Sequence, residues 1–171
     1  KTLVAKGCFK VGLYKQGLLH DMSKYSPTEF WVGAKYYQGT RSPNNAERED
    51  IGYSSAWLHH KGRNKHHYEY WIDYSMQALP GGMAPVPMPD KYIAEMIMDR
   101  IAASKVYMGD EYTDRSPLDY YYQGTDRAPI HPETKTKLLY VLEMLAEEGE
   151  EKTFRFIKEE LVQHKRCMDW H

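Results

Sequence analysis

The sequence predicts an all-α fold, with residues 1–171 forming a single compact helical domain. Apolar residues mostly recur at spacings of three and four, the period of an amphipathic helix, and no clear alternating run marks a strand. Ser-Pro pairs at Ser26 and Ser116 are typical helix starts and support the same class. A chain of 171 residues suits one domain with one sizeable core.

The first half of the chain predicts short helices separated by a loop. Ser26 is followed by Pro27 and, three residues after the cap, by Glu29, which is a strong start signal. The expected elements are a helix from residue 3 that ends between residues 12 and 17, a short helical stretch over 18–25, a helix over 26–38, a loop over 40–45, and helices over 46–60 and 66–76.

Prolines and glycines divide the second half. Ala78 to Pro89 holds four prolines and two glycines, so it is predicted to be a loop. Asp90 then caps a clear helix with apolar residues on or near one face. The expected helices are 90–108, a short Tyr-rich one from residue 116, and two final ones over 131–148 and 150–168.

Composition excludes several classes of protein. The formal net charge is −1, so no strong nucleic-acid signal exists and no global field attracts acidic membranes. No apolar run approaches the roughly 20 residues that cross a bilayer, and the start of the chain lacks a signal peptide. Cys8 and Cys167 form no CxxC pair and are interpreted as reduced thiols, which predicts a cytoplasmic protein.

His20 and Asp21 form the first feature that could carry chemistry. They follow two leucines at the end of a short helical stretch, and Lys24 lies one turn further on the same face. An imidazole and a carboxylate can hold a metal, and an ammonium beside them can hold a phosphate oxygen. The alternative is an ordinary hydrogen-bonded His-Asp pair.

Histidines are concentrated in the run HHKGRNKHH, which holds His59, His60, His66 and His67 with Arg63 between the pairs. Such clustering favours a transition-metal site, and the basic residues suit an anionic substrate. On one straight helix the two pairs would lie about 10 Å apart, too far to share an ion. We therefore expect at most one pair at the primary metal. The alternative is a basic surface loop.

Asp99 is the third feature, because it lies in the middle of an amphipathic helix with apolar neighbours on both sides. A buried carboxylate is costly unless it is paired or metal-bound. One helical turn away, Glu95 and Ala103 offer no positive charge. Asp99 is therefore a candidate metal ligand, and the alternative is a salt bridge to another helix.

Taken together, His-Asp-x-x-Lys, a later His-His and an Asp in M-D-R-I-A-A-S resemble the HD-domain superfamily of metal-dependent phosphohydrolases. The stretches HDMSKYSPTEF and AWLHHKGRNKHHYEYW also resemble a bacterial and phage family of unassigned function, interpreted as a divergent branch. The resemblance covers roughly residues 1–108, which would form the metal-site core, and leaves 109–171 as C-terminal helices.

The resemblance implies roles for individual residues. His20, Asp21 and Asp99 would ligate the metal, and His59 and His60 would bind a second metal. The loop from Arg63 to His67 would face the substrate. These side chains are the predicted metal ligands His20, Asp21, Asp99, His59 and His60, and the predicted substrate contacts Lys24, Arg63, His66 and His67.

One departure from the family pattern concerns its first ligand, a His on the helix before His-Asp. Residues 1–19 contain no His. Either that His lies upstream of Lys1, or another residue substitutes, or the site is degenerate. Mixed oxygen and imidazole ligands favour Mn, Fe, Co, Ni or Zn over Ca, with Mg as a further option.

The expected function is hydrolysis of a nucleotide or other small phosphate ester. Asp21 would hold the metal and the nucleophilic water, while Lys24 and one of His66 or His67 would stabilise the developing charge. Two alternatives stay open: a non-catalytic metal- or ligand-binding helical module, and an oxygen-using di-iron enzyme. The sequence does not give the oligomeric state.

Overall fold

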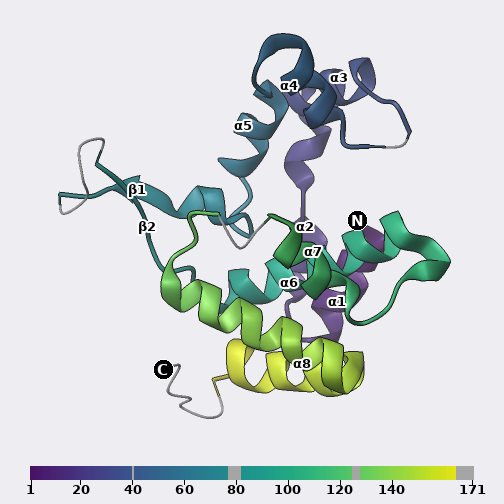
Figure 1. The fold of residues 1–171 in the computed structure, drawn as a ribbon, viewed down its shortest axis with the longest axis vertical. Coiled ribbons are helices and arrows are strands. Elements are labelled where there is room, and N and C mark those ends of the chain that lie inside the picture. The colour runs from purple at the N-terminus through teal and green to yellow at the C-terminus, as the bar shows by residue number, and fades with distance from the viewer. Residues whose placement is uncertain (40, 77–81, 125–127, 165–171) are drawn as a thin grey trace.

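A computed structural model describes the chain except for residues 40, 77–81, 125–127 and 165–171. Within that part the chain forms eight α-helices and a small two-stranded hairpin, which confirms the all-α prediction apart from the hairpin (Figure 1). The α-helices are α1 (Thr2–Lys10), α2 (Tyr14–Leu19), α3 (Pro27–Lys35), α4 (Pro43–Ile51), α5 (Ser55–Lys61), α6 (Asp90–Met108), α7 (Ser116–Gly124) and α8 (Pro132–Phe156). The shorter elements are η1 (Met22–Tyr25), η2 (Tyr68–Trp71), β1 (Ile72–Tyr74), β2 (Met83–Pro85), η3 (Gly109–Glu111) and η5 (Ile157–Val162).

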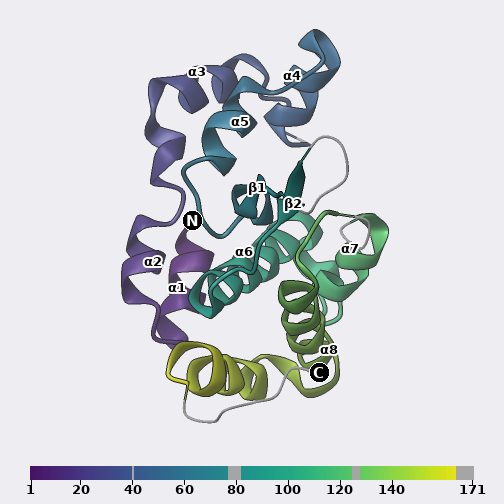
Figure 2. The same ribbon diagram turned by 90° about the vertical axis from the view of Figure 1, so that its left-hand side faces the viewer.

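Helix α6 is the centre of the hydrophobic core (Figure 2). It contacts α1, α7, α8 and η5, which together with α6 form one layer of the molecule. The buried apolar side chains of α6 lie in this layer. The members of the core on α6 are Ile93, Ala94, Met96, Ile97, Met98, Ile101 and Ala102. Burial of apolar surface stabilises the fold by about 25 cal/mol per Å², so the apolar residues that predict α6 also contribute to the stability of the core.

Helices α3, α4 and α5 form a second layer that lies at the far end of the molecule from α8 (Figure 1). Glu47 of α4 fixes this layer from inside: its carboxylate accepts hydrogen bonds from the hydroxyls of Ser54 and Ser55 at 2.6 Å and from the backbone N–H of Ala56. Ser54 in turn caps α5 by accepting from the N–H of Trp57. These bonds orient the helix that carries the first histidine pair.

Two predicted helices differ in the structure. The helix expected over 46–60 is divided into α4 and α5 because Gly52 adopts a positive φ of 83°, the usual C-terminal signal of a helix. The helix expected over 66–76 is replaced by η2 and the short strand β1, which pairs antiparallel with β2. The loop expected over 78–89 contains β2, and its residues 78–81 lie outside the described part.

The two predicted C-terminal helices meet at a kink within α8, where Gly149 has the non-helical angles φ 79° and ψ 173°. After Phe156 the chain continues as a π-helix that ends at Val162, before the predicted end, and residues 165–168 of the predicted segment, with Cys167, lie outside the described part. Among the helices that the structure describes, none has the length and apolar character that a membrane crossing requires.

Candidate metal centre

His20 and Asp21 lie in the turn between α2 and η1, not on a helix as the sequence predicts. Helix α2 ends at Leu19, and Asp21 has a left-handed backbone with φ 55° and ψ 27°. Asp is one of the few residues that visit this region at moderate cost. Both side chains are buried, with exposed fractions of 2% for His20 and 6% for Asp21. The turn therefore holds an imidazole and a carboxylate inside the protein.

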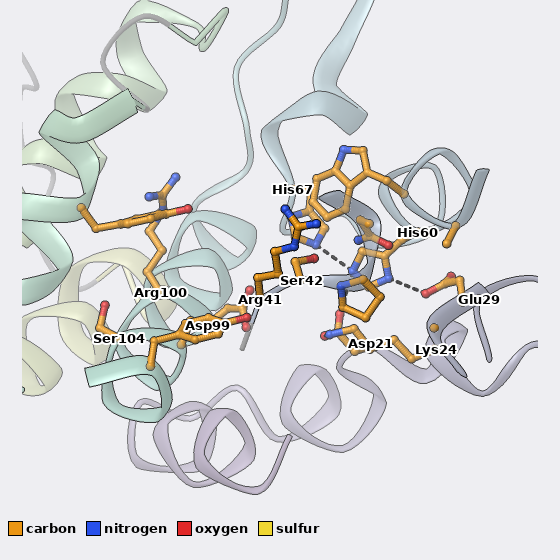
Figure 3. Close-up of a pocket in the computed structure, with 18 of the residues that line it drawn as sticks. Asp21, Lys24, Glu29, Arg41, Ser42, His60, His67, Asp99, Arg100 and Ser104 are labelled. Atoms are coloured by element: carbon orange, nitrogen blue, oxygen red, sulfur yellow. Dashed lines mark hydrogen bonds and ion pairs between the residues drawn. The ribbon is translucent and has the colours of Figure 1, made fainter. Parts of the chain in front are cut away.

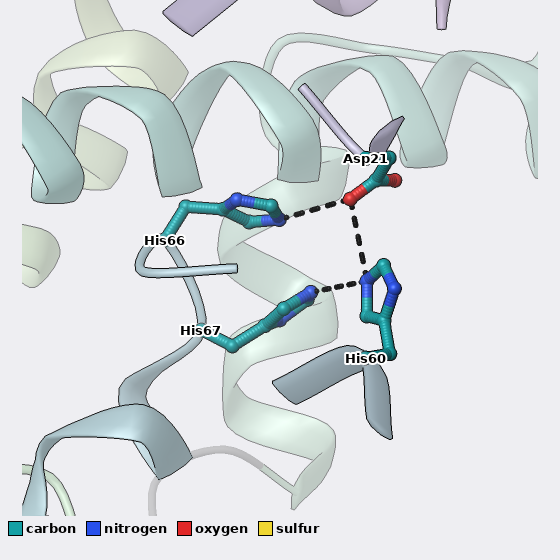
Figure 4. A group of neighbouring side chains, drawn as sticks. All are labelled: Asp21, His60, His66 and His67. Carbon is teal, nitrogen blue, oxygen red and sulfur yellow. Dashed lines mark hydrogen bonds and ion pairs between the residues drawn. The ribbon is translucent and has the colours of Figure 1, made fainter. Parts of the chain in front are cut away.

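Three histidines converge on Asp21 (Figure 4). Its Oδ1 lies 3.2 Å from Nε2 of His60 and 3.5 Å from Nε2 of His66. The Nε2 atoms of His60 and His67 are 2.9 Å apart. Each of these four side chains thus offers one ligand atom to a common point.

These separations fit the edges of a coordination polyhedron. Ligand atoms about 2.1 Å from a metal are roughly 3.0 Å apart at a right angle and roughly 3.4 Å apart at the tetrahedral angle. Three imidazoles and one carboxylate are also a donor set that suits first-row transition metals. Asp21, His60, His66 and His67 therefore fit a divalent cation.

A second group shares Asp21. Nε2 of His20 lies 3.3 Å from Oδ2 of Asp21 and 3.3 Å from Oδ1 of Asp99, which comes from α6. His20, Asp21 and Asp99 thus also offer ligand atoms to one ion. Asp21 stands between the two groups and turns one oxygen toward each.

Several buried atoms of these groups have no hydrogen bond within the described part of the chain. They are Nε2 of His20, Oδ1 of Asp21 and Nε2 of His66. A buried polar atom left unsatisfied costs about 1–3 kcal/mol, so proteins rarely retain several in one place. Cations bound at the two groups would satisfy all three.

Charges around His20 also indicate a place for a cation. Burial opposes protonation, but contacts with Asp21, Asp99 and Glu95 outweigh it and raise the pKa of His20 to about 11. Burial likewise opposes ionisation of Asp21, yet His20, His60 and the Lys24 ammonium hold its pKa far below its ordinary value. Burial, together with His66 and His60, lowers the pKa of His67, which keeps it in the neutral form that binds metals. The ionised carboxylates at this centre are therefore stabilised by positive charge, which a bound cation would supply.

Two buried glutamates that the sequence analysis did not assign hold the other ring nitrogens. Glu95 Oε1 accepts from Nδ1 of His20 at 3.0 Å and lies 3.3 Å from Nδ1 of His66. Glu29 accepts from Nδ1 of His60 at 2.8 Å and from Nδ1 of His59 at 2.6 Å. Glu95 precedes Asp99 by one helical turn, and this spacing was the available signal that both face one site. Nothing in the sequence links Glu29 to the histidines, since it is identified there only as part of a helix start.

The histidine run does not form the straight helix considered from the sequence. Helix α5 ends at Lys61, and Asn64 then bonds back through its Nδ2 to the carbonyl of His60 and to Ser23 Oγ. This reversal brings His66 and His67 beside His60. Members of both pairs therefore meet at one centre, contrary to the expectation that at most one pair would.

Two predicted site residues, His59 and Arg63, lie away from the group around Asp21, and Lys24 lies beside it. His59 lies outside the groups around Asp21, with its Nδ1 on Glu29. Arg63 is exposed, and its guanidinium contacts the carbonyl of His59 at 3.4 Å. Lys24 donates to Oδ2 of Asp21 at 2.6 Å, and 62% of its side chain stays exposed.

A large cleft opens beside the centre, with a volume of about 1410 Å³ (Figure 3). Asp21, Lys24, His60, His67 and Asp99 line one part of it. The remaining lining includes two cationic and several aromatic side chains, namely Arg41, Arg100, Phe30, Tyr37, Trp57, Tyr68, Tyr107 and Tyr120. The candidate ligands are thus accessible to a small molecule.

Comparison with known proteins places the chain in a family. Residues 1–144 match the family of unknown function DUF5662. No curated protein and no solved structure matches the chain. The match spans the turn at Asp21, the histidine run and Asp99, so the buried cluster lies wholly within it. The chain therefore belongs to DUF5662, a family of unknown function.

Proposed function

We propose that this protein is a metal-dependent phosphohydrolase of the HD-domain type that acts on a nucleotide or another small phosphate ester. The observation that carries the proposal is the position of the buried ligand cluster. Asp21, shared by two groups of candidate ligands, lies on the wall of the cleft with the Lys24 ammonium beside it. A cation held there and an anion in the cleft would meet at this point.

The donor set supports the first half of the proposal. Asp21, His60, His66 and His67 would hold one divalent cation, and His20 with Asp99 adjoins them through Asp21. Such a cation supplies Lewis acidity toward a phosphoryl oxygen and lowers the pKa of water. The chain order His20-Asp21 and then Asp99 agrees with the HD-domain pattern. The HD-domain pattern has a histidine ligand before His-Asp. In this chain the histidines of the later run, His60, His66 and His67, would take its place as ligands.

Side chains of the cleft support the second half. Lys24 keeps one carboxylate oxygen of Asp21 in place and exposes its ammonium to the cleft, where it would bind a phosphate oxygen. Asp21 and Asp99 are both ionised, since their pKa values lie below the ordinary value, so each presents a carboxylate to a cation. Glu29 fixes the His60 imidazole through Nδ1, so that its Nε2 faces Oδ1 of Asp21.

The cleft supports a substrate of nucleotide size. A volume of about 1410 Å³ exceeds what a lone phosphate needs. Aromatic side chains such as Trp57 and Tyr120 give a planar group surfaces to pack against, and Arg41 adds a cation at the wall. The near-neutral net charge of the chain disfavours long polyanions.

The test is a turnover assay on protein loaded separately with Mn, Fe, Co, Ni or Zn. The panel contains aryl phosphate mono- and diesters and nucleoside mono-, di- and triphosphates, with phosphate release as the readout. We expect His60→Gln and Asp21→Asn to abolish turnover. His59→Gln is the matched control, because His59 is adjacent in sequence, bonds the same Glu29 and lies outside the cluster. It should retain turnover.

Two results would reject the proposal. One is metal-loaded protein that releases phosphate from no member of the panel, which would leave a metal-binding module. The other is turnover that His59→Gln and His60→Gln reduce equally, because the geometry separates these two residues.

A further inference from the structure

Glu95 is a buried carboxylate on α6 that touches two histidines of the candidate metal centre at once. Its Oε1 lies 3.0 Å from Nδ1 of His20 and 3.3 Å from Nδ1 of His66. The two imidazole rings lie against each other, with centroids 4.4 Å apart. One oxygen atom therefore faces the same edge of both rings.

The opposite edges of the two rings face the other carboxylates. Nε2 of His20 lies 3.3 Å from Asp21 and 3.3 Å from Asp99, and Nε2 of His66 lies 3.5 Å from Asp21. Both Nε2 atoms are buried without a hydrogen bond in the described part of the chain. A carboxylate accepts but does not donate, so an Nδ1 that contacts Glu95 carries a proton, and in the neutral ring this leaves on Nε2 the lone pair that binds a cation.

We infer that Glu95 is a positioning residue, which holds His20 and His66 in the tautomer and ring orientation that present the Nε2 atom of each ring to the cation of its own group. This inference rests on the metal site of the proposed function and deepens it. A carboxylate behind a metal-bound histidine fixes the ring and raises its basicity. Here a single carboxylate serves two rings, so its loss should affect both ligands together.

The rival role for Glu95 is direct ligation, since His20, His66 and Glu95 also form a group of possible ligands. That group would use the Nδ1 atoms and leave both Nε2 atoms unsatisfied beside Asp21. Ligation through Nε2 instead satisfies these atoms and keeps the contacts to Glu95. The geometry favours positioning over ligation.

The experiment compares Glu95→Gln and Glu95→Leu in the full chain, with Zn²⁺ as the probe. Zinc affinity is measured by competition with a chelator, and long-range ¹H–¹⁵N NMR of the zinc-loaded protein reports which nitrogen of each histidine carries the proton. Gln keeps an oxygen that accepts from Nδ1, whereas Leu does not. Asp21→Asn provides the affinity loss of a true ligand. Met98→Leu, a volume-conserving change in the core of the same helix, is the control.

We expect Glu95→Leu to weaken zinc binding about 10–100-fold and to shift the Nδ1–H signals of His20 and His66, because these groups lose the acceptor Glu95. Glu95→Gln should keep both signals and lose less affinity than Asp21→Asn, and Met98→Leu should bind as wild type does. Glu95→Gln that loses as much affinity as Asp21→Asn would overturn the inference in favour of ligation. Nδ1–H signals of His20 and His66 that stay unchanged in Glu95→Leu would overturn it as well.

Should Glu95→Leu not fold, Glu95→Gln alone decides, by the same comparison with Asp21→Asn. No readout depends on turnover. A protein that hydrolyses no phosphate ester can still show the effect of Glu95, and an active protein can lack it, so the two proposals fail separately.

Discussion

Removing one histidine of the cluster around Asp21 should remove most of the stabilisation that a metal gives to the fold. The perturbation is His66→Gln, which deletes one of the four ligand atoms that surround a common point. His59→Gln is the control, because it makes the same chemical change at a residue that lies outside the cluster. Both variants and the wild type are compared with Zn²⁺ and with a chelator.

The magnitude follows from linkage. A ligand present at 100 times its dissociation constant raises the free energy of unfolding by about 2.7 kcal/mol. For a chain of this size each kcal/mol shifts Tm by roughly 2–4 °C, so wild type and His59→Gln should gain roughly 5–11 °C. Loss of a residue that merely supports a ligand costs about 10–100-fold in affinity, so loss of a ligand should cost at least about 100-fold. His66→Gln should then gain only about 0.4 kcal/mol, or roughly 1–2 °C, at the same zinc concentration.

The assay is thermal unfolding followed by far-UV circular dichroism at one zinc concentration, chosen from the wild-type dissociation constant. The reasoning would be refuted if His66→Gln gained as much as the wild type, because the ion would then bind elsewhere. It would equally be refuted if His59→Gln lost the gain, because the separation of the two histidines would then be without consequence.

Three further predictions concern single positions. Lys24→Met should lower kcat/KM for a phosphate ester by about 10²–10³-fold in a steady-state assay. Its metal dissociation constant should not rise, since the change removes a positive charge next to Asp21. Gly149→Ala should lower the free energy of unfolding by about 1–3 kcal/mol in urea, since only glycine readily adopts its φ of 79° with ψ of 173°; no loss would contradict this. Glu47→Gln should cost about 1–3 kcal/mol at pH 7. Hydrogen bonds from Ser54, Ser55 and the backbone hold the pKa of Glu47 below its ordinary value despite burial, so its contribution is full above the unfolded pKa and is lost as the pH falls through the folded pKa. The difference from wild type should therefore shrink in acid, and urea unfolding at several pH values measures it.

Local signals explain what the sequence predicts well. Ser26 caps α3, and its hydroxyl accepts from the N–H of Glu29, as the Ser-Pro-x-Glu pattern indicates. Helix α6 spans Asp90–Met108, the range that its apolar spacing predicts. Both depend on residues within one or two turns, where propensity and capping act.

Long-range contacts explain what it does not predict. The reversal after Lys61 depends on Asn64 reaching Ser23, which is 41 residues earlier in the chain. His66 and His67 contact His60 only because the chain reverses there. A prediction from helical spacing alone therefore places the two histidine pairs apart, whereas the tertiary structure brings them together. Glu95 shows the same limit, because its role depends on rings that come from two other segments. The side chains at 20, 21 and 99 meet because their segments happen to pack together, which periodicity does not encode.

The shared position of Asp21 has a mechanical consequence. The side chains that surround it come from the turn before η1, from the end of α5 and the bend that follows, and from α6. An ion at this point would cross-link the layer of α3, α4 and α5 to the layer around α6 (Figure 1). The carboxylate of Asp21 would then contribute both to metal affinity and to the rigidity of the domain. The loss of any ligand would lower the metal affinity and also allow the two layers to move relative to each other.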